Sequence, residues 1–239
     1  QLTNKIKTPC IIGKLILQGQ TMPSTRYQKI NAHHYRHIWV VGDIHGEYQL
    51  LQSRLHQLSF FPETDLLISV GDNIDRGPES LDVLRLLNQP WFISVKGNHE
   101  AMALDAFATG DGNMWLASGG DWFFDLNDSE QQEAIDLLLK FHHLPHIIEI
   151  TNDIIKYVIA HADYPGSEYL FGKEIAESEL LWPVDRVQKS LNGELQQING
   201  ADYFIFGHMM FDNIQTFANQ IYIDTGSPKS GRLSFYKIR

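Results

Sequence analysis

Cysteine is almost absent from this sequence, since Cys10 is the only one in 239 residues. A single cysteine excludes an intramolecular disulfide framework, and without a CxxC pair the chain has no thiolate zinc or redox motif. Proteins that do without disulfides are typical of reducing compartments. We therefore expect a cytoplasmic protein.

Positive charge is also scarce. The chain has 19 lysines and arginines against 29 aspartates and glutamates, which gives a formal net charge of -10. This balance argues against a general nucleic-acid partner, because phosphate backbones are held mainly by clustered Lys and Arg. It does not argue against a phosphorylated substrate, because a bound metal ion reverses the local sign of a site.

Long apolar runs are missing as well. No stretch approaches the ~20 apolar residues of a membrane span, so no membrane association is expected. The short apolar run at residues 10–17 is interrupted by Lys14, and no small-x-small cleavage site follows it, which argues against a secretion signal. Residues 1–21, which precede Met22, are expected to form a flexible extension, and residues 22–239 a single catalytic domain.

What the sequence does contain is one unit repeated three times. Apolar strands predicted at residues 37–41, 66–70 and 91–95 each run into a polar turn that carries glycine, and a helix follows. Asp72 lies 29 positions after Asp43, and Asn98 lies 26 after Asp72, close to the ~30 residues of a β-α-β unit. The pattern predicts an α/β fold whose parallel strands bring the three turns to one edge.

The remainder of the chain is less regular. Residues 110–120 are rich in glycine and are predicted to form a loop, and an acidic-headed helix is expected over 128–141. A polar segment at about 165–200 is a candidate lid or substrate wall. Short strands are expected at residues 147–150, 157–160, 203–206, 221–223 and 233–238.

Polar side chains gather at the predicted strand ends: Asp43, His45, Asp72, Asp75, Arg76, Asn98, His99, His161 and His208. Carboxylate, amide oxygen and imidazole without thiolate suit a borderline divalent ion such as manganese, iron or zinc. The number of such groups fits two ions rather than one. Two ions roughly 3.5–4 Å apart clamp phosphorus for in-line attack by a shared hydroxide, so phosphate-ester hydrolysis is the predicted reaction.

The motifs GDIHG at 42–46, GDNIDRG at 71–77 and GNHE at 97–100 are followed by HADYP at 161–165, FIFGH at 204–208 and YIDTG at 222–226. In this order they resemble the phosphoprotein phosphatases of the calcineurin-like metallophosphoesterase family, in the bacterial and phage branch typified by the lambda protein phosphatase. The resemblance implies a central β-sandwich of mixed sheets flanked by helices. It also implies a protein-serine/threonine phosphatase, with phosphotyrosine as an additional candidate substrate. Phosphorylated proteins are the expected substrates, and two divalent ions, with Mn²⁺ favoured, are the expected cofactors.

The resemblance also implies a role for each site residue. Asp43, His45 and Asp72 are expected on the first metal, and Asp72, Asn98, His161 and His208 on the second, with Asp72 bridging. His99 is expected to be the general acid, held by Asp75, and Arg76 to grip the phosphate. Asn98 is also expected near the substrate.

Two positions depart from the family pattern. Val184 stands where a second phosphate-binding arginine is usual, so either Arg186 takes that role or the phosphate is held less tightly. Met209 replaces a small hydroxyl residue after the last histidine.

Several nearby residues are expected to have structural roles. Glu100 is expected to head a helix, and Trp115 and Trp122 to anchor the core or a loop. For Asp163 and Tyr164, support of the neighbouring ligand and ordinary turn structure are equally compatible with the sequence.

Two other functions stay open. A dinucleoside-tetraphosphate hydrolase of the same superfamily shares GDIHG and RGPESLDVL, although Asp75 and Glu100 stand where that branch tends to differ. The other is a non-catalytic phospho-recognition protein on this scaffold, which Val184 suggests and the complete ligand set disfavours.

Overall fold

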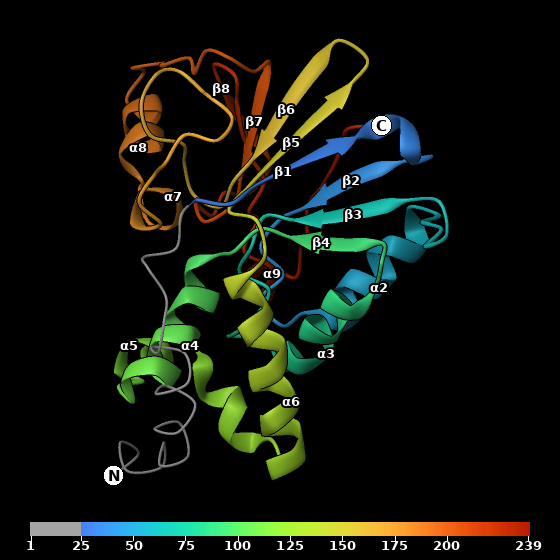
Figure 1. The fold of residues 1–239 in the computed structure, drawn as a ribbon, viewed down its shortest axis with the longest axis vertical. Helices are drawn as coiled ribbons and strands as arrows, with labels where there is room; N and C mark the ends of the chain where they lie inside the picture. The colour runs from blue at the N-terminus through green and yellow to red at the C-terminus, as the bar shows by residue number, and fades with distance from the viewer. Residues whose placement is uncertain (1–24) are drawn as a thin grey trace.

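The computed structural model describes residues 25–239, so the expected extension at 1–21 lies outside the described residues. Two sheets form its centre (Figure 1). The four-stranded sheet has the order β10-β2-β3-β4, with bounds Phe235–Lys237, Ile38–Val41, Leu66–Ser69 and Phe92–Ser94. The six-stranded sheet has the order β1-β5-β6-β7-β9-β8, with bounds Tyr27–Asn31, Ile147–Asn152, Ile155–Ile159, Tyr203–Phe206, Gln220–Tyr222 and Gln215–Phe217.

The two sheets pack face to face because their strands alternate between two apolar layers. In β3, Leu66 and Ile68 enter the core between the sheets, together with Ile148 of β5 and Ile205 of β7. The intervening residue Leu67 points the other way, into a second core. Side chains that alternate along a strand face opposite sides of its sheet, so the expected β-sandwich of mixed sheets is confirmed.

Helices cover the outer faces of both sheets. α2 (Tyr48–Gln57) and α3 (Ser80–Arg85) pack on the four-stranded sheet, and α7 (Ser178–Leu181) and α8 (Asp185–Leu191) on the six-stranded one. A separate helical core is built by α4 (Asn98–Thr109), α5 (Asn113–Ala117) and α6 (Asp128–Leu139), below the sheets in Figure 1. The last helix is α9 (Ser227–Ser230), and four short 3-10 helices lie at Ala32–His34, Leu86–Asn88, Gly120–Asp125 and Lys140–His142.

The three predicted β-α units are present with the expected geometry. β2, β3 and β4 are parallel neighbours, so their polar turns lie at one edge of the sheet. β6, β7 and β9 are parallel to one another in the second sheet, which brings the turns after β6 and β7 to its corresponding edge. The two edges meet, and the candidate site lies between them.

The prediction of a loop at 110–120 is wrong. Residues 113–117 form α5, and a 3-10 helix begins at Gly120. Trp115 and Trp122 are buried against Phe107 and Phe123, and this aromatic packing stabilises helical turns that the local glycine content alone disfavours. The expectation that the two tryptophans anchor the core is confirmed.

The strands β1 and β8 were not expected from the sequence. β1 has the polar sequence YQKIN, and only Ile30 in it is buried. It is defined by parallel pairing with β5, about half the chain away. Among residues 25–239, no helix has both the length and the apolar character of a membrane span.

Candidate metal and phosphate site

Both sheets contribute predicted metal ligands to one buried cluster. Asp43, Asp72 and Asn98 follow β2, β3 and β4, whereas His161 and His208 follow β6 and β7. Nε2 of His161 lies 2.8 Å from Oδ1 of Asn98 and 3.4 Å from Oδ1 of Asp72, and Nδ1 of His208 lies 3.0 Å from the same Asn98 oxygen. The backbone N–H of His208 donates to Oδ2 of Asp43 at 3.0 Å. The structure thus brings the predicted ligands together.

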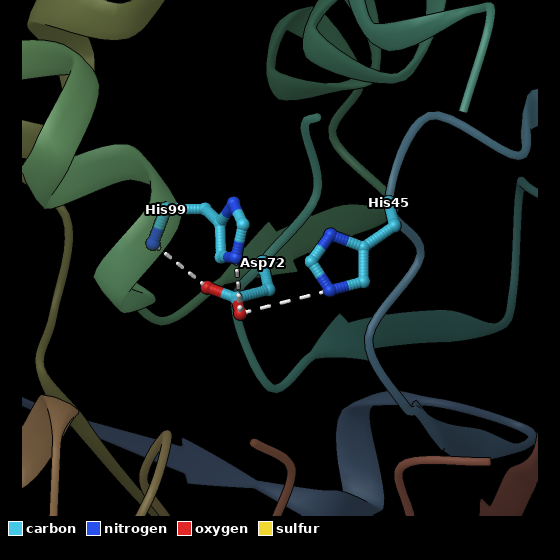
Figure 2. A group of neighbouring side chains, drawn as sticks. All are labelled: His45, Asp72 and His99. Atoms are coloured by element: carbon cyan, nitrogen blue, oxygen red, sulfur yellow. Dashed lines mark hydrogen bonds and ion pairs between the residues drawn. The ribbon is translucent and has the colours of Figure 1, made fainter. Parts of the chain in front are cut away.

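Asp72 lies at the centre of the cluster (Figure 2). Its Oδ2 lies 3.8 Å from Nε2 of both His45 and His99, and its Oδ1 accepts from the backbone N–H of His99 at 3.0 Å. Burial raises the pKa of Asp72, but the neighbouring His99 ring and the backbone N–H that His99 donates lower it further, so the pKa stays below its usual value. Asp72 is therefore an anion that faces imidazoles from both sheets, as its expected bridging role requires.

The ring orientation of two histidines is fixed by backbone carbonyls. Nδ1 of His45 donates to the oxygen of Ile74 at 2.9 Å, and Nδ1 of His161 donates to the oxygen of Val70 at 2.8 Å. Burial lowers the pKa of His45 to about 3 and lowers that of His161, so both rings are neutral. A neutral ring that donates through Nδ1 presents a lone pair on Nε2 to the site, which is the form that binds metal.

The contacts of Asn98 test whether a cation fits. Nε2 of His161 carries a lone pair, and so does Oδ1 of Asn98 at 2.8 Å, with an Asp72 oxygen at 3.4 Å from the same nitrogen. Acceptors so close together are unfavourable unless a cation is shared between them. Burial lowers the pKa of His208 to about 4, so this ring also is neutral near pH 7. The donor set thus fits a divalent ion.

Asp43 is buried near the cluster but lies apart from its two tightest groups. Those groups are His45, Asp72 and His99, and Asp72, His161 and His208. Burial, followed by the charges of Asp224 and Asp72, raises the pKa of Asp43 well above its usual value. Adjacent buried carboxylates disfavour each other's ionised form, and a divalent cation relieves this repulsion. The place of Asp43 on the first metal stays a prediction.

His99 is paired with Asp75 in the interior. Nδ1 of His99 donates to Oδ2 of Asp75 at 2.7 Å. Burial lowers the pKa of His99, but Asp72 and the bond to Asp75 raise it more, so the net direction is upward. The pairing leaves Nε2 directed at the cluster (Figure 2), where a ring with a raised pKa is a suitable proton donor near neutral pH.

The guanidinium of Arg76 contacts both His45 and His99. Its Nη1 lies 2.8 Å from Nε2 of His45 and its Nη2 lies 3.0 Å from Nε2 of His99. The guanidinium therefore faces the cluster, where its planar fork suits phosphate oxygens.

Arg186 is placed differently from the other predicted site residues. Its Nε donates to Oδ1 of Asp163 at 2.9 Å, and its Nη2 donates to the backbone oxygens of Tyr164 and Gly166 at 3.0 and 2.6 Å. The side chain is 9% exposed. These contacts tie α8 to the turn after His161. Substrate binding by Arg186 stays a prediction, and it would require the guanidinium to leave these partners.

Comparison with known proteins agrees with this geometry. The Calcineurin-like phosphoesterase family matches residues 36–211. This chain belongs to the calcineurin-like phosphoesterase family. Serine/threonine-protein phosphatase 2 of Escherichia coli (strain K12) is 96% identical over 218 residues, which cover 91% of this chain and 100% of that protein.

Two further proteins are similar to this chain, one in part of its sequence and one in fold. A symmetrical bis(5'-nucleosyl)-tetraphosphatase of Erwinia tasmaniensis is 36% identical over 126 residues, 52% of this chain and 43% of that protein. A protein serine/threonine phosphatase from Saccharomyces cerevisiae has a similar fold, with a TM-score of 0.60 and 19% sequence identity over 92% of this chain and 74% of that one.

The phosphoesterase site is built on strained backbone. Non-glycine residues with a left-handed φ include His45 at 47°, Asp72 at 51°, Asp75 at 74°, Arg76 at 70° and His208 at 64°. Such conformations each cost of order 1–3 kcal/mol and cluster at functional sites. Here they let short turns aim consecutive side chains into one space, as the dipeptide Asp75-Arg76 does.

Two site residues have roles beyond those expected. Glu100 lies in the first turn of α4, as predicted, and its carboxylate also accepts from the backbone N–H groups of Asp72, Asn73 and Gly97. Asp224 was missed: it is buried near Asp43, and burial raises its pKa to about 6. Its only sequence signal is its place in YIDTG, after a strand that is parallel to β7.

Proposed function

We propose that this chain is a metal-dependent protein phosphatase that hydrolyses phosphoserine and phosphothreonine in phosphorylated proteins, with phosphotyrosine as an additional candidate substrate. The observation that carries the proposal is the buried cluster around Asp72, with its lone pairs directed inward and the Asp75–His99 pair at its side. The name serine/threonine-protein phosphatase 2, borne by a relative at 96% identity, supports the substrate class.

Two divalent ions are proposed as cofactors, with Mn²⁺ favoured over Fe or Zn. Asp43, His45 and Asp72 would hold one, and Asp72, Asn98, His161 and His208 the other. Imidazole and oxygen donors without thiolate suit these metals. When bound, such ions polarise phosphoryl oxygens and lower the pKa of water.

The chain's own residues then divide the remaining work. Arg76 would bind two oxygens of the phosphate, leaving the histidine nitrogens that it contacts here. His99 would donate the Nε2 proton to the departing serine or threonine oxygen, with Asp75 stabilising the charged ring. Asn98 lies beside both metal-binding histidines and would border the phosphate.

A dinucleoside-tetraphosphate hydrolase is the second candidate. The Erwinia relative that bears this name supports it, although the match covers only 52% of this chain. A cytoplasmic location is proposed from the single cysteine. A non-catalytic phospho-recognition role is the least supported, because the three side chains expected to act in catalysis, Asp75, Arg76 and His99, all match the family pattern.

Turnover on matched substrates tests the proposal. Protein loaded with Mn²⁺ and protein stripped with a chelator are compared on phosphoserine and phosphothreonine peptides and on diadenosine tetraphosphate. We expect phosphopeptide hydrolysis that needs the metal, and its loss in Asp72→Asn. Preferred turnover of the dinucleotide would establish the second candidate, and no turnover of any substrate by the loaded protein would favour recognition without catalysis.

A further inference from the structure

Two tryptophans donate to the carboxylate that holds His99. Nε1 of Trp122 donates to Oδ1 of Asp75 at 2.7 Å, and Nε1 of Trp115 donates to both oxygens, at 3.0 and 3.1 Å. His99 occupies Oδ2 at 2.7 Å. The side chain of Asp75 has no exposed surface, and among residues 25–239 its carboxylate accepts hydrogen bonds from these three side chains. Asp75 is therefore held from two directions that are independent of His99.

Simple core packing does not explain this arrangement. Buried indole N–H groups usually need an acceptor, but any carbonyl serves that purpose. Within residues 25–239, Nε1 of Trp39 is buried and has no hydrogen-bond partner, so burial of an indole in this fold does not by itself bring an acceptor to it. Two indoles, seven positions apart, donate to the same carboxylate. This convergence indicates that they serve to hold Asp75 in place rather than only to satisfy their own N–H groups.

The same segment also holds the neighbouring arginine. The backbone oxygen of Gly119 accepts from the N–H of Arg76 at 3.1 Å. A Cβ on Gly119 would lie 2.8 Å from that nitrogen, and a Cβ on Gly120 would lie 2.5 Å from Nε1 of Trp115. The absence of a side chain at Gly119 thus allows the segment to approach the backbone of Arg76, and its absence at Gly120 allows close packing against the indole of Trp115. The dipeptide that it contacts has left-handed φ values of 74° and 70°.

We propose that residues 113–125 are a positioning element for catalysis. Trp115 and Trp122 fix Asp75, and through it the direction of His99, while Gly119 fixes the backbone of Arg76. Trp115 and Trp122 act through Asp75, and Gly119 acts through the backbone of Arg76. The proposal rests on the proposed phosphatase function for its kinetic consequence, but its structural content is independent of the substrate.

The kinetic test uses leaving groups of different basicity. Trp122→Phe removes the shortest indole bond and keeps an aromatic ring, and Phe123→Leu is the control, because Phe123 packs on both tryptophans without donating. Loss of a residue that orients a functional group typically costs about 10- to 100-fold. We expect Trp122→Phe to lower kcat by about 10-fold on a phosphoserine peptide and less on p-nitrophenyl phosphate, whose leaving group needs little help from an acid. KM and Mn²⁺ affinity should not change.

The control separates positioning from loosening of the core. Phe123→Leu should lower the melting temperature without producing the difference between the two substrates. If Trp122→Phe slows both substrates equally, or no more than Phe123→Leu does, the positioning role is wrong. If the wild-type protein hydrolyses none of the substrates, the proposed function is wrong, and the positioning role is then tested by the NMR measurement below.

An NMR measurement tests the element without activity. Asp75→Asn keeps the shape of the side chain and removes its charge, and the chain has five tryptophans, so its indole N–H region should hold five signals that single Trp→Phe variants can assign. We expect the Trp115 and Trp122 signals to move upfield and the other three to stay. If the first two do not respond to Asp75→Asn, the bonds do not exist in solution and the proposal falls.

Discussion

Nε of Arg186 donates to Oδ1 of Asp163 at 2.9 Å, inside the fold. Asp163 follows the predicted metal ligand His161 by two positions, so the bond joins α8 to the turn that carries that ligand. Two backbone oxygens of the same turn accept from the guanidinium. Arg186 thus donates to three acceptors in this turn. Its bond to Asp163 holds the turn that carries His161, so a role of Asp163 in turn structure and a role in supporting the predicted ligand are compatible.

Arg186→Ala is expected to destabilise the fold. Breaking a buried ion pair leaves an unpaired charge and typically costs about 3–5 kcal/mol. Chemical denaturation of the variant and of wild type measures the difference, with the exposed Arg232→Ala as control. KM should change little for the fraction that is folded. A large rise in KM without loss of stability would mean that the guanidinium moves to the phosphate after all.

His99→Asn is expected to keep the metal and lose turnover. Asn cannot donate a proton to a leaving oxygen, and a positioned acid is worth about 10²–10⁴ in rate. Kinetics on a phosphoserine peptide, with calorimetric titration of Mn²⁺ in parallel, separate the two properties. Turnover equal to that of wild type would remove His99 from the mechanism.

Gly97→Ala is expected to prevent metal binding. A Cβ at Gly97 would lie 2.2 Å from Oδ1 of Asp72 and 2.3 Å from its nitrogen, so the central carboxylate must shift. Gly110→Ala is the control, because a Cβ there meets nothing within 4 Å although its φ is +79°. Metal analysis of both purified variants should find Mn²⁺ in the control alone. Full Mn²⁺ occupancy in Gly97→Ala would contradict the central place of Asp72.

Acid sensitivity is expected from Glu177, which joins the segment before α7 to the turn before Asn98. It accepts from Nζ of Lys96 and from Nε2 of His146, both at 2.9 Å. Burial raises the pKa of Glu177, but these two partners lower it further, to about 2. A depressed folded-state pKa contributes stability above the unfolded value of about 4.3 and loses it as the pH falls.

The predicted result is a decline in the free energy of unfolding between about pH 4.3 and pH 2. Glu177→Gln should be less stable than wild type at pH 7, and the two proteins should converge as the pH approaches 2. Denaturant titrations across this range measure both curves. Parallel curves would show that the pairing adds no stability in solution.

The repeated strand, turn and helix units were predictable because their signals are local. An apolar run that ends in a glycine turn can be recognised without knowledge of distant residues. The spacing of Asp43, Asp72 and Asn98 predicted correctly that the three strands are parallel neighbours. Several of the predicted ligands lie just after these strands, which explains why the sequence could place them together; their binding of metal stays a prediction.

Features that depend on distant partners could not be predicted in this way. β1 is a strand because β5 offers it a paired edge, and its own polar sequence gives little sign of that. The helical turns at 113–125 depend on burial of Trp115 and Trp122 near Asp75, so their local glycine content was misleading. Asp224 lies near Asp43 because β9, the strand that precedes it, pairs in parallel with β7 in the second sheet.

The division of the predicted metal ligands between the two sheets has a consequence for folding. Asp43 and His208 are 165 positions apart, yet they meet across the sandwich. A half-folded chain with only one sheet formed would offer an ion part of its coordination shell. A cation held by these residues would therefore act as a late cross-link that favours docking of the sheets and resists their separation. Metal depletion should loosen the seam between the sheets before it melts either one.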